Sequence, residues 1–272
     1  MNSLQATQPI GIFDSGVGGL TVANAIKLLL PNEDIIYFGD TAHLPYGEKS
    51  PETIRHYSER ISDFLLEHGC KVILIACNTA SAVAHECVSR HVDNRAIVLD
   101  VIDPVVETIV QLSGHKRVGV IGTKTTIHSA AYPKKIKAAR PDLDVQVLAT
   151  PLLVPMIEEG FIFDDISNAI IRSYLSNPVL ADIDALILGC THYPIIKNQI
   201  SKYYNFTVHI LDSATAVATQ LRNTLARRAL LNLNEGSTRK FFISDYTDNF
   251  KAISRIFFEE DIDLQKLDLW HG

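Results

Sequence analysis

Two of the four cysteines stand where a thiol could take part in a reaction. Cys77 and Cys190 each follow a short apolar run typical of a buried strand, and each precedes a segment that we expect to be helical. The first turn of a helix has unpaired N–H groups and a partial positive charge, which lower the pKa of a nearby thiol. The other two, Cys70 and Cys87, lie at a helix end and within a helical run, so we predict that they are buried and inert.

Proton transfer suits this pair of thiols better than metal binding or redox chemistry. Two cysteines and His192 supply fewer converging ligands than a zinc site needs, and no short-range Cys/His pattern adds others. A redox pair would place its two sulfurs side by side. Inverting a stereocentre instead needs a base on one face and an acid on the other, and a thiolate and a thiol can exchange those roles. If the fold sets them on opposite sides of a ligand, the two cysteines indicate a two-base proton transfer.

The elements that would place these thiols repeat along the chain. Short apolar runs rich in β-branched residues alternate with helical periodicity, which predicts an α/β fold with mostly parallel strands. A strand, polar turn and helix at residues 10–15 recur at residues 118–123, and Cys77-Asn78-Thr79 recurs as Cys190-Thr191-His192. We therefore predict two similar lobes, each a mostly parallel sheet flanked by helices, with the active site in the cleft between them. Strands are expected at residues 10–13, 35–38, 71–76, 118–121, 144–148, 185–188 and 240–243.

The predicted lobes do not split the sequence into two halves. A tail with helices expected at residues 214–231 and 249–258 follows the second lobe, and it is long enough to return to the first. We therefore assign residues 1–102 and 213–272 to the first lobe and residues 103–212 to the second.

The turn after the first strand combines a carboxylate, a hydroxyl and three glycines. Asp14-Ser15-Gly16-Val17-Gly18-Gly19 leads into a helix expected at residues 20–30, and free backbone N–H groups in such a turn favour an anion. The glycine spacing matches neither GxGxxG nor GxxxxGKS/T, so a nucleotide is not indicated. Further along, residues 39–49 read as a loop, and Ser50 followed by Pro51 predicts the start of the next helix.

Composition and charge exclude several classes of protein. Hydrophobic residues make up 47% of the 272 residues and charged residues 21%, as a folded globular protein requires. The net charge is -6 and no basic run stands out, so a nucleic acid is not expected as the main partner. No basic leader precedes an apolar segment at the start, and no apolar run could span a bilayer. We expect a cytoplasmic protein without membrane contact, whose thiols are reduced.

Six segments of the sequence form a specific set, namely residues 11–19, 45–50, 76–80, 122–129, 151–158 and 189–194. Each segment is a weak signal alone, but together and in this order they resemble the glutamate racemases. These are cofactor-independent amino-acid racemases that make D-glutamate for bacterial cell walls. The resemblance extends from near the N-terminus to residue 194. One departure is Thr150, where many members have cysteine, and this position does not touch the expected chemistry.

The resemblance implies a role for each matching residue. Cys77 would act on the Cα–H of D-glutamate with the help of Asp14, and Cys190 would act on L-glutamate with the help of His192 and Glu158. Hydroxyls and backbone amides would hold the substrate without a cationic side chain. The substrate-binding set comprises Asp14, Ser15, Pro45, Tyr46, Gly47, Asn78, Thr79, Thr123, Thr126, Thr191 and His192. The resemblance also implies no metal, no pyridoxal or other cofactor, a role in peptidoglycan synthesis and a homodimer.

Other interpretations remain open from the sequence alone. An aspartate or hydantoin racemase of the same superfamily would share the two thiols, although the Cys-Thr-His triplet and the Asp-Ser-Gly turn favour glutamate. A two-lobed binding protein could close on an acidic amino acid without reacting with it. Without the resemblance, Glu158 would be a solvated charge at a helix end and His192 a packed or surface histidine. His43, His56, His68 and His85 are expected to be structural or exposed.

Overall fold

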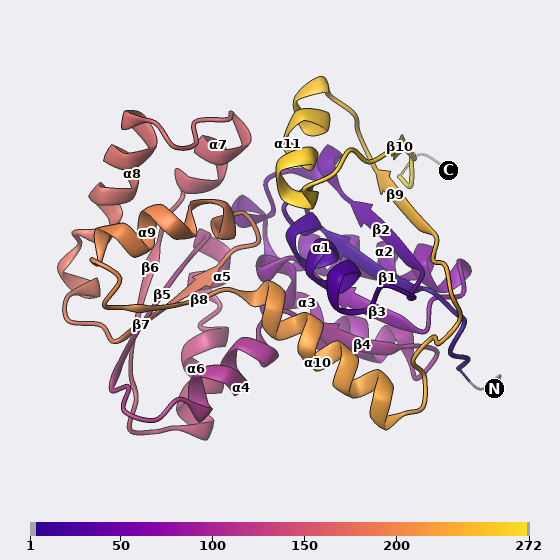
Figure 1. Cartoon of the computed structure of the whole chain (residues 1–272), viewed down its shortest axis with the longest axis horizontal. Coiled ribbons are helices and arrows are strands. Elements are labelled where there is room, and N and C mark those ends of the chain that lie inside the picture. Colours follow the sequence, from indigo (N-terminus) through magenta and orange to yellow (C-terminus); the bar gives the residue numbers. More distant parts are fainter. Residues whose placement is uncertain (1–3, 271–272) are drawn as a thin grey trace.

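The computed structural model describes residues 4–270, so residues 1–3 and 271–272, at the two ends of the predicted first lobe, lie outside it. Two separate parallel sheets, each flanked by helices, stand next to one another (Figure 1). This arrangement confirms the predicted α/β fold class with two similar sheets. Within residues 4–270, no helix combines the length and the apolar character that crossing a membrane requires.

The first sheet has six parallel strands in the order β10-β9-β2-β1-β3-β4. Strands β9 and β10 come from the end of the sequence and extend the sheet beyond β2, at the right of Figure 1. The strands are β1 (Ile10–Asp14), β2 (Ile35–Gly39), β3 (Val72–Ile75), β4 (Ile97–Asp100), β9 (Arg239–Ile243) and β10 (Leu264–Lys266). Strands β1, β2 and β3 are buried throughout, as their continuous apolar runs predict.

Helices cover both faces of the first sheet. They are α1 (Leu20–Leu29), α2 (Pro51–Glu67), α3 (Asn78–Val92), α10 (Ser213–Arg227) and α11 (Asp248–Phe258). Apolar side chains of α1, α10 and α11 share one core with Ile10 and Ile12, whereas those of α2 and α3 share another with Phe13 and Ile75. Successive strand residues point to opposite faces, so one strand serves both cores.

The second sheet has four parallel strands in the order β6-β5-β7-β8. Its strands are β5 (Arg117–Gly122), β6 (Asp144–Ala149), β7 (Ala185–Gly189) and β8 (His209–Leu211). Its helices are α4 (Asp103–Gln111), α5 (Lys124–His128), α6 (Ala131–Ala139), α7 (Leu153–Glu158), α8 (Asp165–Leu175) and α9 (Lys197–Tyr203). The core under α7, α8 and α9 is continuous with the core under α1, α10 and α11, so apolar packing joins the two halves.

The observed elements follow the predicted ones with local exceptions. Ser50 accepts the N–H of Thr53 at 3.3 Å and caps α2, which begins at Pro51 as predicted. Residues 39–49 are more ordered than the predicted loop, because they contain the 3-10 turns η1 (Thr41–His43) and η2 (Tyr46–Glu48). Two further 3-10 turns are η3 (Pro178–Leu180) and η4 (Tyr193–Ile196).

Candidate active site

One pocket collects the polar turns that follow the strands of both sheets. The carboxyl ends of parallel strands are the usual binding edge of an α/β sheet. Here β1, β2 and β3 of the first sheet and β5, β6 and β7 of the second open onto a cavity of about 310 Å³. Its lining consists of Ser15, Leu44, Pro45, Tyr46, Gly47, Glu48, Cys77, Asn78, Thr79, Thr123, Lys124, Thr150, Pro151, Val154, Pro155, Glu158, Cys190, Thr191 and His192. Of the residues predicted for the site, only Asp14 and Thr126 lie behind this lining rather than in it.

Cys77 occupies the N-cap of α3, directly after β3. Its Sγ accepts the N–H of Ala80 at 3.5 Å and donates to Ser15 Oγ at 3.5 Å. Burial, reinforced by the nearby carboxylate of Asp14, raises the pKa of the Cys77 thiol to about 12. The prediction of a lowered pKa is therefore wrong, because the N–H of Ala80 and the hydroxyl of Ser15 lower it by less than burial raises it. Cys77 is a neutral thiol at neutral pH.

Cys190 directly follows β7 and has a different local structure from Cys77. The α-helix predicted directly after it is absent, since residues 193–196 form the 3-10 turn η4 and α9 begins only at Lys197. The group next to the sulfur of Cys190 is therefore a histidine side chain and not the N-terminus of an α-helix. The Sγ of Cys190 lies 3.7 Å from Nδ1 of His192, and Nε2 of His192 lies 2.9 Å from a carboxylate oxygen of Glu158.

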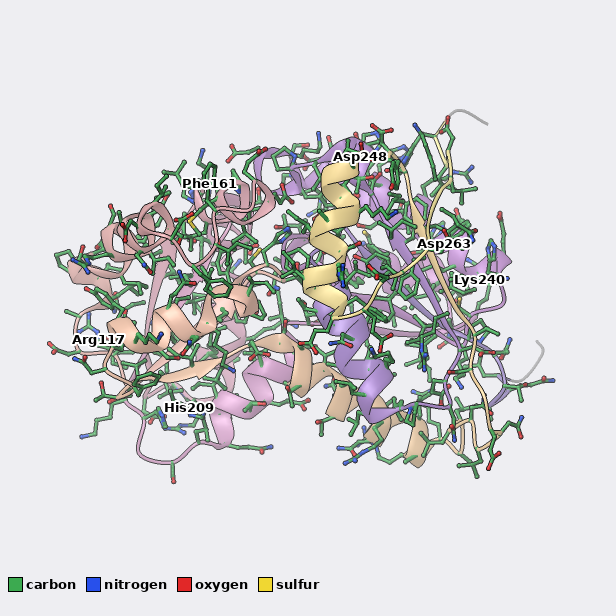
Figure 2. The ribbon with its side chains drawn as sticks, turned by 45° about the horizontal axis from the view of Figure 1, so that its top comes forward. Arg117, Phe161, His209, Lys240, Asp248 and Asp263 are labelled. Atoms are coloured by element: carbon green, nitrogen blue, oxygen red, sulfur yellow. The ribbon has the colours of Figure 1, made fainter. Side chains whose placement is uncertain are left out.

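His192 is buried between these two partners. Burial opposes its charged form, but the hydrogen bonds to Cys190 and Glu158 outweigh burial and raise the pKa of His192 well above its ordinary value. These contacts therefore favour the charged imidazolium form of His192 beside Cys190. Phe257 of α11 meets its ring edge to face, with centroids 5.2 Å apart. Figure 2 shows α11, which begins at the labelled Asp248, lying over the boundary between the two halves.

Two N–H groups of the glycine-rich turn after β1 are not free, although the sequence suggested that they would be. The N–H groups of Gly16 and Gly19 donate to Oδ2 of Asp14 at 3.2 and 2.9 Å, so the turn's own carboxylate takes up the donors expected for an anion. The other oxygen of Asp14, Oδ1, is buried and has no hydrogen-bond partner among the residues described. Burial raises the pKa of Asp14, although the charge of His192 and the backbone N–H groups lower it.

Gly18 instead allows the two halves to approach. A Cβ at this position would lie 2.4 Å from Nδ1 of His192 and 2.7 Å from Oγ1 of Thr191. Next to it, the hydroxyl of Thr21 donates to the carbonyl oxygen of Thr191 at 3.2 Å. The missing side chain therefore makes room for the histidine that contacts Cys190.

Three threonine hydroxyls, from segments that follow strands of both sheets, meet at one wall of the pocket. Oγ1 of Thr79 lies 2.9 Å from Oγ1 of Thr123 and 3.2 Å from Oγ1 of Thr126. Thr123 also caps α5 by accepting the N–H of Thr126 at 3.3 Å. Thr126 thus supports the two threonines of the lining from behind.

Asn78 presents an amide whose orientation is fixed by a residue that the sequence did not single out. The hydroxyl of Tyr132, on α6, donates to Oδ1 of Asn78 at 2.7 Å. Nδ2 of Asn78 is buried and has no partner among the described residues, so a hydrogen-bond donor is left at the pocket wall. Tyr132 resembles any aromatic residue of an amphipathic helix, so no local pattern distinguishes it.

Tyr46 lines the pocket, but its hydroxyl is used within the protein. Its hydroxyl donates to Oδ2 of Asp40 at 2.7 Å, so it is already bonded inside the protein. Tyr46 and Gly47 begin η2, and the first N–H groups of such a turn have no partner within it. A Cβ on Gly47 would lie 2.7 Å from Cβ of Thr123, so this loop lies directly against the second sheet.

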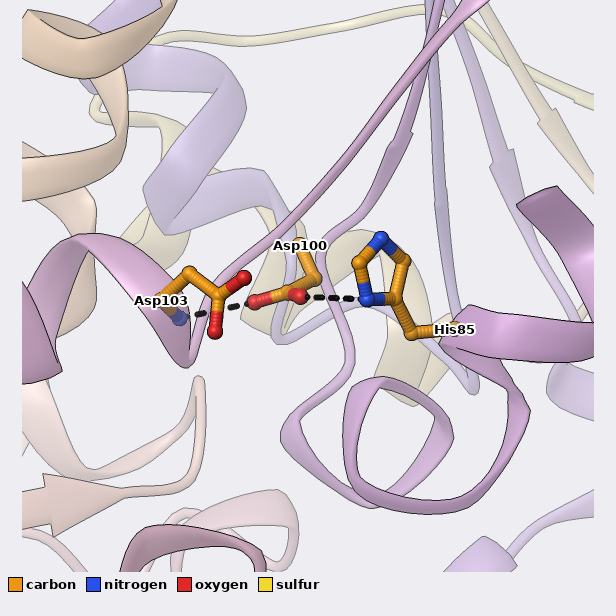
Figure 3. A group of neighbouring side chains, drawn as sticks. All are labelled: His85, Asp100 and Asp103. Atoms are coloured by element: carbon orange, nitrogen blue, oxygen red, sulfur yellow. Dashed lines mark hydrogen bonds and ion pairs between the residues drawn. The ribbon is translucent and has the colours of Figure 1, made fainter. Parts of the chain in front are cut away.

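A second group of ionisable side chains lies outside the pocket (Figure 3). His85, Asp100 and Asp103 form the one group in residues 4–270 whose three ligand-type atoms lie within 4.8 Å of one another. Oδ1 of Asp100 accepts the N–H groups of Ile102 and Asp103 at 2.7 and 2.8 Å, and its Oδ2 lies 3.0 Å from Nδ1 of His85. Asp103 pairs with Lys135. These contacts cap the start of α4, which agrees with a structural place for His85.

Known proteins resemble this chain over nearly its whole length. A model of the Asp/Glu/hydantoin racemase family matches residues 20–221. The glutamate racemase of Neisseria meningitidis is 42% identical over 259 residues, which cover 94% of this chain and 95% of that protein.

Solved structures agree with the sequence comparison. The crystal structure of glutamate racemase from Francisella tularensis, in complex with D-glutamate, superimposes with a TM-score of 0.90 at 39% identity, covering 97% of this chain and 98% of that one. A glutamate racemase isoform from Bacillus anthracis gives a TM-score of 0.93 at 32% identity, covering 97% and 99% of the two chains. The chain is thus an amino-acid racemase, an isomerase, and it belongs to the Asp/Glu/hydantoin racemase family.

Proposed function

We propose that this chain interconverts L- and D-glutamate by proton transfer at Cα between two cysteines. The observation that carries the proposal is that Cys77 and Cys190, which follow corresponding strands of the two sheets, line one pocket. The similar proteins that are named glutamate racemases, among them the Francisella enzyme with bound D-glutamate, support glutamate as the substrate.

The surroundings of the two thiols differ, which suggests how a reaction cycle starts. Nδ1 of His192 lies 3.7 Å from the sulfur of Cys190 and can take up its proton, whereas burial keeps Cys77 a neutral thiol. Cys190 then removes the proton from Cα of L-glutamate, and Cys77 delivers its own proton to the opposite face of the carbanion. The two sulfurs end the step with exchanged protonation states, from which D-glutamate reacts in reverse. Asp14, buried near Cys77, assists that sulfur, while His192 and Glu158 assist Cys190.

Neutral donors would bind the two carboxylates of the substrate. The pocket offers Nδ2 of Asn78, the N–H groups of Tyr46 and Gly47, and the hydroxyls of the threonine wall. Lys124 is the one lysine of the lining, and it is paired with Glu48 at 3.2 Å. Charge-assisted hydrogen bonds from neutral donors hold carboxylates well. The ammonium group of the substrate, next to Cα, stabilises the developing carbanion, so the proposed mechanism requires neither a metal nor pyridoxal.

The proposal also includes the division into lobes, the use of the product and the oligomeric state. We place residues 1–102 and 213–272 in one lobe and residues 103–212 in the other, which is supported by strands β9 and β10 joining the sheet of β1. The D-glutamate formed would supply peptidoglycan synthesis in the cytoplasm, and the enzyme would act as a homodimer. The four free thiols are compatible with a reducing compartment.

Rates with two amino acids test the substrate assignment. We expect glutamate to be racemised faster than aspartate by about 10- to 200-fold in kcat/KM, the range that one methylene group contributes in a fitted pocket. Circular dichroism of each pure enantiomer over time measures both rates without coupling enzymes. Faster turnover of aspartate would refute the assignment to glutamate. Binding of glutamate without any turnover would instead leave the binding-protein interpretation.

The pH dependence tests the role of Glu158. Its carboxylate is one of the groups that raise the pKa of His192, so Glu158→Gln lowers that pKa. In this variant the imidazolium loses its proton at a lower pH than in wild type. The alkaline limb of the pH profile of kcat for L-glutamate is therefore expected to shift to lower pH. Glu159→Gln is the matched control, because Glu159 is the exposed neighbour on the same turn. A profile of Glu158→Gln that coincides with that of Glu159→Gln would exclude the proposed assistance.

A further inference from the structure

A buried carboxylate ties the substrate loop to the end of the chain. Asp40 is fully buried and accepts hydrogen bonds from the hydroxyl of Tyr46 at 2.7 Å, the hydroxyl of Ser244 at 2.8 Å and Nε1–H of Trp270 at 3.1 Å. Nδ1 of His43 lies 2.9 Å from the same carboxylate. We call Asp40 with these four partners the Asp40 hub. Its members come from the loop after β2, the end of β9 and the C-terminal segment.

Trp270 is firmly placed in the Asp40 hub. Its ring meets those of His43 and Tyr57 edge to face, with centroids 4.5 and 5.0 Å apart. Its backbone N–H donates to Asp268 at 2.9 Å, and the N–H of Leu267 donates to the carbonyl oxygen of Ile243 at 2.9 Å. The C-terminal segment is therefore anchored along β9, and its last described residue contacts the hub both by packing and by a hydrogen bond.

The second half of the molecule holds the other side of the same loop. The hydroxyl of Thr125 donates to the carbonyl oxygen of Gly47 at 2.9 Å, and Lys124 pairs with Glu48. Gly47 has no room for a side chain beside Thr123. The loop of residues 44–48 is thus fixed between the Asp40 hub on one side and α5 on the other.

We propose that Asp40 and Trp270 are positioning residues for substrate binding. They act through Tyr46: the hub fixes its hydroxyl, and this holds the backbone of Tyr46 and Gly47 in place where these residues line the pocket. A buried carboxylate that loses a donor is left with an unsatisfied hydrogen bond, which costs free energy, so the loop shifts to restore it. The inference rests on the proposed function for its substrate. It assigns no chemical step to the hub, so we expect KM to change and kcat to stay nearly constant.

The test removes one hydrogen bond of the Asp40 hub at a time. Trp270→Phe keeps an aromatic ring and loses the Nε1–H donor, and Ser244→Ala loses a hydroxyl donor. We expect each to raise KM for both glutamate enantiomers about tenfold, the effect of one charge-assisted hydrogen bond, with kcat within about twofold of wild type. Tyr246→Phe, an exposed tyrosine close to Ser244 in sequence, is the matched control and leaves both constants unchanged.

A double-mutant cycle separates positioning from a general loss of stability. Asp40→Asn is expected to raise KM more than Trp270→Phe, and the double variant no further than Asp40→Asn alone, because both substitutions break the same contact. Multiplicative effects in the double variant, or a wild-type KM in Trp270→Phe, would overturn the proposal. If Asp40→Asn fails to fold, the two single-donor variants carry the test.

Hydrogen exchange tests the positioning role of the Asp40 hub without any substrate. In Trp270→Phe without ligand, amides of residues 44–49 are expected to exchange faster than in wild type, whereas those of α8 keep their rate. Unchanged exchange rates in residues 44–49 would refute the positioning role of the Asp40 hub, even if the enzyme racemises glutamate. A wild-type protein that does not racemise glutamate refutes the proposed function, and the exchange measurement still decides on the hub.

Discussion

Replacing either Cys77 or Cys190 with alanine is expected to abolish racemisation and to leave the fold intact. A two-base mechanism needs an acid and a base in every turnover, so one missing sulfur stops both directions. A positioned acid or base contributes about 10²- to 10⁴-fold to a rate, and we expect a loss at the upper end of this range because the proposed mechanism assigns no second group to either proton transfer. Initial rates from pure L- and pure D-glutamate measure the loss in each direction.

The chain provides matched controls for this prediction. Cys87 lies half-buried on α3, the helix that Cys77 caps, and Cys70 is buried beside Gly11, away from the pocket. Cys87→Ala and Cys70→Ala remove the same atom without touching the site, so both are expected to keep wild-type kcat. Circular dichroism and thermal unfolding verify that all four variants are folded. Full activity of Cys77→Ala or Cys190→Ala would refute the two-base assignment.

Gly18→Ala is expected to have the second largest effect although it adds one methyl group. The new Cβ would lie 2.4 Å from Nδ1 of His192, a distance that real Cβ atoms do not show, so the histidine must move. His192 is enclosed by Glu158 and Phe257 and cannot turn away without losing its contact with Cys190. A displacement of about 1 Å costs on the order of 100-fold in rate. We therefore expect kcat to fall by at least that factor.

A second glycine distinguishes crowding from backbone strain. Gly114 has φ +86° and open space where a Cβ would stand, so Gly114→Ala adds strain of about 1–3 kcal/mol far from the pocket. We expect this control to unfold at a lower temperature and to keep its activity. Gly18→Ala is expected to lose activity while its unfolding temperature stays close to that of wild type. Wild-type kcat in Gly18→Ala would contradict the tight approach of the two halves at His192.

Much of the fold could be predicted from local patterns in the sequence. The apolar runs of β1, β3 and β7 and the Ser50-Pro51 start of α2 need no information from distant residues. Strands β8 and β10 were not predicted, because three residues are too few for a period of two to appear. Strand β4 was also missed, although residues 97–99 form a continuous apolar run, because the run is only three residues long before Asp100.

The sequence indicated which residues gather around the pocket, but it did not indicate their electrostatics. The sequence placed Cys77 at a helix start, yet the sign of its pKa shift depends on burial and on the nearby Asp14, and neither follows from that position alone. The N–H groups of the glycine turn were expected to bind an anion, but Asp14 of the same turn accepts them first. Asp40 bonds to Tyr46 within one loop and Tyr132 bonds to Asn78 across the fold, and the sequence around Asp40 and Tyr132 gives no sign of either contact.

Isotope transfer from solvent tests the two-thiol mechanism most directly. L-glutamate is incubated with the wild-type enzyme in D₂O without pyridoxal, and both enantiomers are analysed by mass spectrometry at low conversion. Because Cys77 would deliver a solvent-derived deuteron while Cys190 holds the substrate's proton, we predict D-glutamate with one deuterium at Cα and recovered L-glutamate that is still protiated. D-glutamate that retains the original proton, or recovered L-glutamate deuterated to the same extent as the product, would show that a single base serves both faces and would contradict the mechanism.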